Sequence, residues 1–464
     1  MPDVIIMGGL NTALLNAMSG LNASQGALDA TSNNIANVNT PGYTREEPLL
    51  TENQETETGG EISGGGVQLL GLQSIRDELL NLQINQQTSL QGAANAESSS
   101  LDQVQTLFNP TGTDIASALS DFSSSLVELS GNPTSASAQQ AVLSAGQDLA
   151  TAFNTTANGL TSAQTAATQQ VPDTVSQINS LTAQIAQLNG QLGQIPAVED
   201  GGTTQDQLDQ AVQQLAGLTN ISVTQTNNGE TITTGNGTPL VIGDQSYNLQ
   251  SAPGANGQAV VQDSNGNNIT SSITGGTLGG SLTIANQTIP GILTQLNTLA
   301  SQFATAFNTA QSGGTDSNGN AGAAFFSGTT NLNSAAADIS VALTSPSQVA
   351  ISSDGSTGGS GNVANLSAAL TNDLPSGQSA SGGIASIVFN VGTAASTAST
   401  QSTAIGDNLT QLTDQQGSVS AVNIDEETTN LLRYQTAYEA ASRVVSTVQV
   451  LDNAALDMGS STSF

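Results

Sequence analysis

The sequence predicts a mainly α-helical protein with an inserted β domain, and three observations support this prediction. Apolar residues recur every seven positions near both ends of the 464-residue chain. Between the ends, several long stretches place apolar residues three or four positions apart, which is the spacing of one helix face. Near residue 220 the spacing changes to two, and Asn-Gly pairs separate short apolar runs as they do in β-hairpins.

Two rows of apolar residues, which we call the terminal seams, define the helices at the chain ends. The seam residues are Leu14, Leu21, Leu28 and Ile35 at the N-terminal end, and Ile424, Leu431, Tyr438 and Val445 at the C-terminal end. A seven-residue repeat keeps a narrow stripe on one side of a slightly under-wound helix, and that stripe needs a partner helix. A short heptad also occurs in ordinary helix bundles. Its presence at both ends nevertheless favours coiled-coil-like terminal helices that pair with each other.

The same periodicities divide the chain into parts that follow a nested order. They are a terminal helical domain (1–45 and 424–464), a linker (46–71), a helical core domain of long bundled helices (72–220, 286–312 and 390–423), an inserted β domain (221–285) and a Gly/Ser-rich mixed region attached to the core (313–389). In the core, 136–160 and 171–195 are expected to be two separate helices. In the mixed region, 387–391 has the composition of a weak strand.

The composition excludes several classes of function. The chain has four basic residues and a net charge of −32, whereas binding to nucleic acid or to anionic membranes requires basic surfaces. Cys and His are absent, so the chain has no disulfide, no Cys/His metal site and no thiol or imidazole catalyst. The first residues lack the pattern of a cleaved signal peptide, and no apolar run is long enough to cross a membrane. A chain with no cysteine and few charged residues would suit a protein that works outside the cell, and if it is exported it needs a route without a cleaved signal peptide.

The search for catalytic or metal sites finds only structural patterns. Asn423 and Glu426 form a capping box at the start of a helix, which accounts for the acidic cluster 425–427. The repeated sequence Asp-Ser-Asn-Gly-Asn, at 263–267 and 316–320, has its glycine misplaced for a calcium loop and fits a turn better. No zinc-protease, serine-hydrolase or phosphate-loop spacing occurs. We predict no catalytic residue, no cofactor and no metal site.

Both ends of the chain resemble the flagellar rod, hook and hook-associated axial proteins. The resemblance rests on SGLNASQGALDATSNNIANVNTPGYTREE at 19–47 and on SVSAVNIDEETTNLLRYQTAYEAASRVVSTVQVL at 418–451. The residues at the centre of the N-terminal motif are Asn33, Asn34, Asn37, Pro41, Gly42 and Tyr43. The hook-associated members of the family are the most similar, and their helical middle is similar to this chain with lower specificity.

The resemblance implies a structural subunit of the bacterial flagellum, with no enzymatic activity, that forms a ring of identical copies at the junction between hook and filament. In such proteins the terminal helices form an inner tube, the helical domain forms the next shell and the β domain projects outward. The implied partners are the hook protein, a second hook–filament junction protein, the flagellar type III export apparatus, and a cytoplasmic chaperone on the C-terminal helix. The motif asparagines are expected to hydrogen-bond near the Pro41-Gly42 turn.

Three alternatives remain open at this point. The chain could be another axial protein, such as the hook subunit or the second junction protein. It could be a secreted adhesin that uses the β domain as its binding module. An enzyme is the weakest alternative, because the sequence offers no constellation of base, nucleophile or metal ligands.

Overall fold

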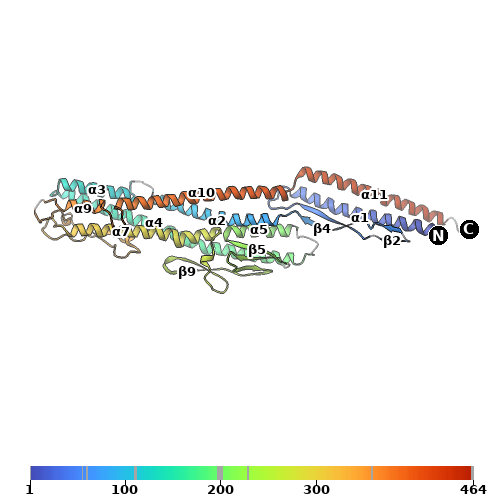
Figure 1. Ribbon diagram of the computed structural model, residues 1–464, viewed down its shortest axis with the longest axis horizontal. Helices are drawn as coiled ribbons and strands as arrows, with labels where there is room; N and C mark the ends of the chain where they lie inside the picture. Colours follow the sequence, from blue (N-terminus) through green and yellow to red (C-terminus); the bar gives the residue numbers. More distant parts are fainter. Residues whose placement is uncertain are drawn as a thin grey trace.

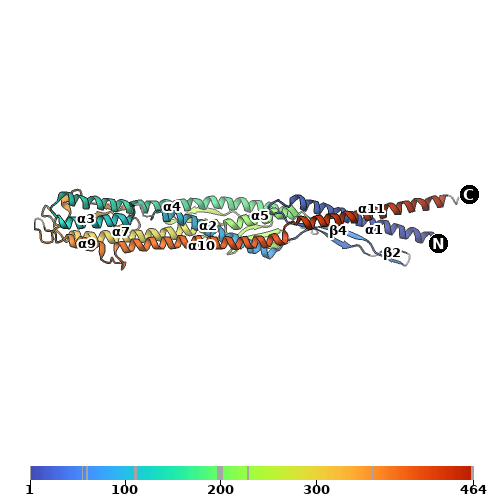
Figure 2. The same cartoon turned by 90° about the horizontal axis from the view of Figure 1, so that it is seen from above.

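The computed structural model describes residues 2–54, 56–58, 61–108, 112–195, 202–226, 229–356 and 359–460. The molecule is an elongated rod with a slender end, which we call the arm, and a thicker part, which we call the body (Figures 1 and 2). The start of the first helix and the end of the last helix lie at the tip of the arm. Long helices and a few small antiparallel sheets make up the rod, which confirms the predicted mainly α fold with inserted β structure.

Two long helices form most of the arm. α1 (Pro2–Asn37) runs from the tip toward the body, and α11 (Ile424–Ser460) returns beside it to the tip. The two helices are therefore antiparallel neighbours. Together they close the out-and-back path that the nested order of segments predicts.

A β-hairpin covers one side of α1. Its strands are β1 (Glu46–Glu52), β2 (Thr56–Thr58), β3 (Glu61–Ser63) and β4 (Val67–Ser74), and β1 pairs with β4 while β2 pairs with β3. Gly26 of α1 approaches Leu69 of β4 so closely that a Cβ would clash, and Asn16 Nδ2 donates to the carbonyl of Gly64 at 2.8 Å. The linker predicted at 46–71 is instead paired strand over most of its described residues, because the strands pair with each other and β1 and β4 pack against α1.

The body is a bundle of helices. They are α2 (Glu78–Thr106), α3 (Ile115–Gly131), α4 (Ala136–Leu192), α5 (Gly202–Leu218), α6 (Gly276–Thr283), α7 (Ile289–Ser312), α8 (Ala335–Asp338), α9 (Val363–Thr371) and α10 (Ala380–Ser420). α4 has 57 residues and joins the two helices expected at 136–160 and 171–195. Pro172 lies inside α4, but Ala167, Val171 and Val175 around it are buried. Packing on both sides of the proline outweighs the loss of one helical hydrogen bond.

The expected weak strand at 387–391 lies inside α10. Ile384, Ile387, Val391 and Ala395 are buried at spacings of three and four, so they form one face of a helix. The apolar run at 387–391 is too short for the spacing of its residues to distinguish a helix from a strand. The rest of the mixed region contains α8, α9 and two short paired strands, β11 (Phe326–Ser327) and β12 (Ser340–Val341).

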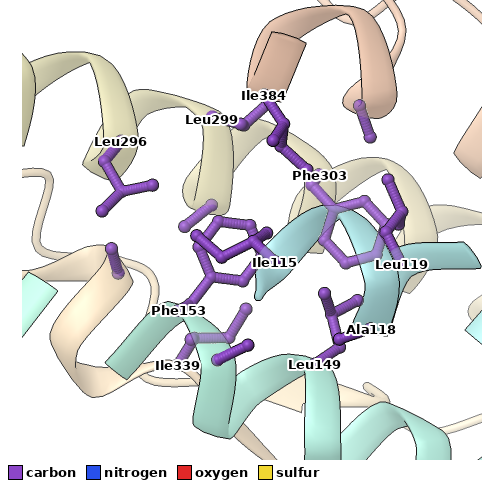
Figure 3. Close-up of a cluster of buried hydrophobic side chains, with 14 of the residues drawn as sticks. Ile115, Ala118, Leu119, Leu149, Phe153, Leu296, Leu299, Phe303, Ile339 and Ile384 are labelled. Carbon is purple, nitrogen blue, oxygen red and sulfur yellow. The ribbon is translucent and has the colours of Figure 1, made fainter. Parts of the chain in front are cut away.

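The main core of the body lies between α3, α4, α7 and α10, far from the arm. Figure 3 shows how Leu119, Phe153, Phe303 and Ile384 converge there from these four helices. Nearby, the Phe122 ring centroid lies 5.1 Å from that of Phe307 and is surrounded by further phenylalanines. Tilted and edge-to-face aromatic pairs of this kind stabilise a core beyond their buried area.

A second core holds the inserted sheet against α4 and α5. The sheet has the order β5 (Ile221–Thr226), β6 (Gly229–Thr234), β7 (Pro239–Ile242), β8 (Gln245–Ser246), and β9 (Gln250–Pro253) pairs with β10 (Ala259–Gln262) beside it. Ile232, Leu240 and Val241 pack against Ile185 and Leu215 of the helices. The sheet stands on one side of the rod (Figure 1).

The predicted β domain extends too far along the chain. The predicted range includes residues 276–285, which instead form α6 and the start of a π-helical turn, Ile284–Thr288. Gly280 of α6 lies against the backbone of Ala93 in α2 with no room for a side chain. This close helix packing, which the glycines permit, overrides the alternating pattern around Leu282. None of the described helices has the length and hydropathy of a membrane span.

Candidate assembly site: the arm and its polar junction

Small side chains form the inner face of α1. The buried residues of this helix are Ala17, Ala23, Ser24, Ala27, Ala30, Thr31 and Asn34. They lie between α1, α11 and the hairpin, and Ala27 has no exposed surface. Small residues let helix and strand backbones approach closely. The predicted seam names the large apolar residues beside this row, whereas the small residues are the ones that a single chain buries.

The predicted seam residues occupy the borders of the helix pair. Leu14, Leu21, Leu28, Ile35, Leu431 and Val445 are half-buried, whereas Ile424 and Tyr438 are exposed. Only Glu427 and Val448 are buried among the described side chains of α11. The structure thus brings the two helices together, but a single chain does not bury their seams. The role of the seams in contacts between copies stays a prediction.

The arm leaves large apolar side chains in solvent. Leu15 and Met18 on α1 are 58% and 49% exposed, and Leu432 and Val450 on α11 are 60% and 67% exposed. Burying an apolar side chain of this size is worth about 1.5–3 kcal/mol. Several such residues along two helices form a surface that can contribute to association.

Asn34 is the centre of a hydrogen-bond network at the base of the arm, which we call the polar junction. Its Nδ2 donates to the Glu46 carbonyl at 2.9 Å, and its Oδ1 accepts from the Glu46 N–H at 3.0 Å and from the Tyr43 hydroxyl at 2.9 Å. Its side chain also hydrogen-bonds to the Glu427 carboxyl group. One buried amide therefore connects α1, β1 and α11.

Arg45 holds α11 at the same junction. Its guanidinium lies 2.8 Å from the Glu426 carboxylate and 3.3 Å from the Glu47 carboxylate, and the backbone N–H of Arg45 donates to the carbonyl of Ser420 at 2.9 Å. Ser420 and Glu426 flank the break between α10 and α11. The N-terminal motif thus fixes the point where the chain re-enters the arm.

Arg76 makes a second cluster, between the arm and α5. Its guanidinium contacts Asp206 at 2.5 Å and Asp209 at 3.3 Å, and it donates to the Gly202 carbonyl at 3.2 Å. Asp206 also accepts from the Thr44 N–H at 3.1 Å. Sequence reasoning missed both arginine clusters, because their partners are distant in the chain. The only available signal was that two of the four basic residues flank 46–74.

The other motif residues build the turn between α1 and β1. Gly42 has φ of 78°, which favours glycine, and the Tyr43 N–H donates to the Thr40 carbonyl at 3.2 Å. Asn37 Nδ2 donates to the Asn33 carbonyl at 3.0 Å. Asn33, Pro41 and Gly42 are exposed. Of the three asparagines, Asn34 is therefore the one buried in the junction.

Burial controls the ionisation of the junction. It raises the pKa of Tyr43, and the nearby carboxylates of Glu46, Asp206 and Glu427 add to this effect. Burial also raises the pKa of Glu427, while the hydrogen bond from Asn34 and the charge of Arg45 act in the opposite direction. The Tyr43 hydroxyl is thus kept neutral as a donor. No three acidic side chains in the described ranges are placed to hold a metal ion.

Family models match the arm and the body separately. The flagella basal body rod protein family matches 14–44, the helical domain of flagellar hook-associated protein FlgK matches 101–326, and the C-terminal domain of the flagellar basal body rod FlgEFG proteins matches 415–458. The two rod-type matches contain most of α1 and α11, and the FlgK match covers most of the helical body and the inserted sheet.

Relatives extend the similarity over the full chain. Flagellar hook-associated protein 1 of Escherichia coli is 27% identical over 97% of this chain and 100% of its own length. The protein of the same name from Salmonella typhimurium is also 27% identical with the same coverage. That of Bacillus subtilis is 34% identical over 119 residues, which are 24% of this chain and 23% of the relative.

A solved structure shares the fold. The flagellar hook junction protein FlgK from Burkholderia pseudomallei aligns with a TM-score of 0.67 and 19% identity, over 73% of this chain and 100% of that chain. The FlgK domain match, the full-length relatives and the solved structure therefore agree, in sequence and in fold, on the same family. This chain belongs to the FlgK family of flagellar hook-associated proteins.

Proposed function

We propose that this protein is a structural subunit of the bacterial flagellum at the junction between hook and filament, and that it is not an enzyme. The observation that carries the proposal is the arm, a pair of antiparallel terminal helices that leaves large apolar residues such as Leu432 and Val450 exposed. Chains of the FlgK family assemble in the axial structure, and an unburied face on two rigid helices is what such an assembly needs.

The arm would contact identical copies in a ring. The seam residues and the exposed apolar side chains would lie between neighbouring arms, which would form the inner tube, while the body would form the next shell and the sheet would point outward. In this arrangement the chain divides into a terminal domain, a helical core, an inserted β domain that ends before α6, and a mixed region. The arginine clusters at Arg45 and Arg76 would transmit load between arm and body.

The neighbours along the axis would be the hook protein on one side and a second junction protein on the other. The chain would reach this extracellular position through the flagellar type III apparatus, without a cleaved signal peptide. The exposed residues of α11 would be a hazard for association in the cytoplasm. A chaperone that covers α11 until export would remove this hazard.

Deletion of the gene tests the proposal. Cells without this protein should make hooks that carry no filament and should release filament protein into the medium. Immunogold labelling of wild-type cells should place the protein at the tip of the hook, whereas label along the hook would favour a hook subunit and label over the cell surface would favour an adhesin. Filaments of normal number on the deletion strain would contradict the proposal.

A further inference from the structure

A cavity of about 990 Å³ lies where the arm, the body and the inserted sheet meet. Its wall is built from the turn after α1, the residues around the start of α2, α5, the strands β5 and β6, and the end of α10. A volume of this size is typical of sites for small ligands. The cavity lies away from the exposed apolar surface of the arm, so the proposed assembly does not account for it.

The lining of this cavity is acidic. Its titratable residues are Arg76, Glu78, Asp206, Asp209 and Glu230, so four carboxyl groups face one guanidinium. Arg76 contacts Asp206 and Asp209. Among the described residues, neither Glu78 nor Glu230 forms an ion pair. The cavity therefore carries negative charge that this chain leaves without a basic partner.

Glu230 has one buried carboxyl oxygen that lacks a hydrogen-bond partner. Its side chain is 5% exposed; Oε1 accepts from Gln225 Nε2 at 3.1 Å, but Oε2 is buried without a hydrogen-bond partner. Its backbone is fixed, because Asn189 of α4 accepts from its N–H at 2.9 Å and donates to its carbonyl at 2.8 Å. Buried polar atoms are normally paired. A rigid, unpaired carboxyl oxygen at a cavity points to a ligand from outside the chain.

The arrangement of the acceptors selects the type of ligand. The acidic groups line one cavity, but no three acidic side chains among the described residues are placed to hold a metal ion. Amide side chains such as Asn81, Gln213 and Gln416 add further acceptors to the wall. Distributed oxygen acceptors suit a cation with several N–H donors, which an ammonium or guanidinium group provides.

We propose that this cavity binds an organic cation through an ammonium or guanidinium group, with Glu230 and Glu78 as the anionic partners. The cation takes the place of a proton on Glu230. Burial raises the pKa of Glu230 to about 7, and the nearby carboxylates of Asp209 and Glu78 add to this effect, while the hydrogen bond from the Gln205 side chain and the charge of Arg76 oppose it. Asp206 is the remaining acid in the lining. Binding then converts the carboxylic acid and the cation into an ion pair and releases the proton to the buffer.

Calorimetric titration of the full chain with agmatine tests this proposal. Agmatine should bind with saturation, more tightly at pH 8 than at pH 6, because the proton must leave Glu230. At pH 7 the bound cation should release about half a proton, which titration in buffers of different ionisation enthalpy measures. Glu230→Gln should lower the affinity roughly tenfold and abolish the proton release. Glu128→Gln, on the exposed face of α3, is the matched control and should behave as wild type.

A parallel titration distinguishes two sources of the cation. A blocked Gly-Arg-Gly peptide carries the guanidinium group as a protein would, whereas agmatine carries it as a free molecule. Tighter binding of the peptide would identify the ligand as a basic side chain of a partner, and tighter binding of agmatine would identify it as a small molecule. Absence of saturable binding of both would overturn the proposal. Equal binding by wild type and by a folded Glu230→Gln variant, with unchanged proton release, would also overturn it.

Discussion

At the scale of single residues, Asn34 shows how one side chain can fix three segments. It is 1% exposed, and its side chain hydrogen-bonds to both the N–H and the carbonyl of Glu46. It also pairs with the Tyr43 hydroxyl and with Glu427. Both the Nδ2 and the Oδ1 atom of its side-chain amide are hydrogen-bonded within the arm. Asn34 therefore holds the segments of the junction together, which Asn33 and Asn37 do not do, although all three belong to the same motif.

Asn34→Ala should loosen the polar junction. Several buried donors and acceptors would lose their partner, so we expect local opening to become easier by about 2 kcal/mol. Amide hydrogen exchange of the full chain measures this effect as faster exchange at 43–46 and at the start of α11. Asn33→Ala removes an exposed asparagine one residue away and should change the exchange little. Equal effects of the two substitutions would contradict the role given to Asn34.

Glu230 should make folding stability depend on pH. Its pKa is about 7 in the folded chain and 4.5 for the free side chain, so the folded state binds more protons between these values. Stability from this group is present at low pH and is lost as the pH rises toward 7. Glu230→Gln should remove this loss, which amounts to about 3 kcal/mol. The difference between the two proteins in denaturant unfolding at pH 5 and pH 8 isolates Glu230 from the other acids, and parallel pH profiles would contradict the assignment.

At the scale of elements, the arm depends on small residues more than on large ones. Ala27 and Ala30 allow α1 to lie against both α11 and β4, and Gly26 leaves room for Leu69. Large seam residues lie at the edges of this contact and are half-buried. The small residues therefore determine how closely the elements pack within one chain, while the large ones remain available to neighbours.

Ala27→Leu should separate the elements of the arm. The side chain of Ala27 is fully buried, and three added carbons would displace α11 or the hairpin at a cost of about 1–3 kcal/mol. Ala13→Leu is the matched control on an exposed face of the same helix, where leucine and alanine have similar helix propensity. Hydrogen exchange along α1 and α11 should accelerate in the first variant and stay unchanged in the second. Wild-type protection from hydrogen exchange in Ala27→Leu would show that Ala27 does not lie in a close contact between α1 and its neighbours.

At the scale of the whole molecule, the rod combines a self-contained body with an arm whose surface is incomplete. The body has two cores, one around Phe122 and one between α4, α5 and the sheet. The arm exposes apolar residues along both helices. A chain with a net charge of −32 resists contact with its own copies. Assembly then requires that apolar contacts between arms outweigh this repulsion.

Association of the purified chain should increase with ionic strength. Salt screens the repulsion between acidic surfaces over distances of about 10 Å at 0.1 M and about 3 Å at 1 M, whereas apolar contacts are not weakened by it. Sedimentation velocity at increasing sodium chloride should therefore show a shift from monomer to larger species. A shift in the opposite direction would indicate that ion pairs, rather than apolar contacts, hold the copies together.

Sequence patterns predicted the long helices and the change to β structure, because these features depend on local periodicity. They did not predict the hairpin at 46–71, whose short strands are stabilised by α1, or the continuity of α4 through Pro172. They also did not predict the contact of Arg76 with Asp206, which are 130 positions apart. Each of these features is determined by packing between distant segments, about which a single sequence contains no direct signal.

The most direct test of the central claim, that the exposed face of the arm joins copies at the hook–filament junction, compares two valines. Val450 on α11 and Val127 on α3 are both 67% exposed. In a deletion strain that expresses Val450→Glu, we expect the protein to be exported into the medium but hooks to remain without filaments. Val127→Glu should restore filaments like wild type. Normal filaments with Val450→Glu, counted by electron microscopy, would contradict the account.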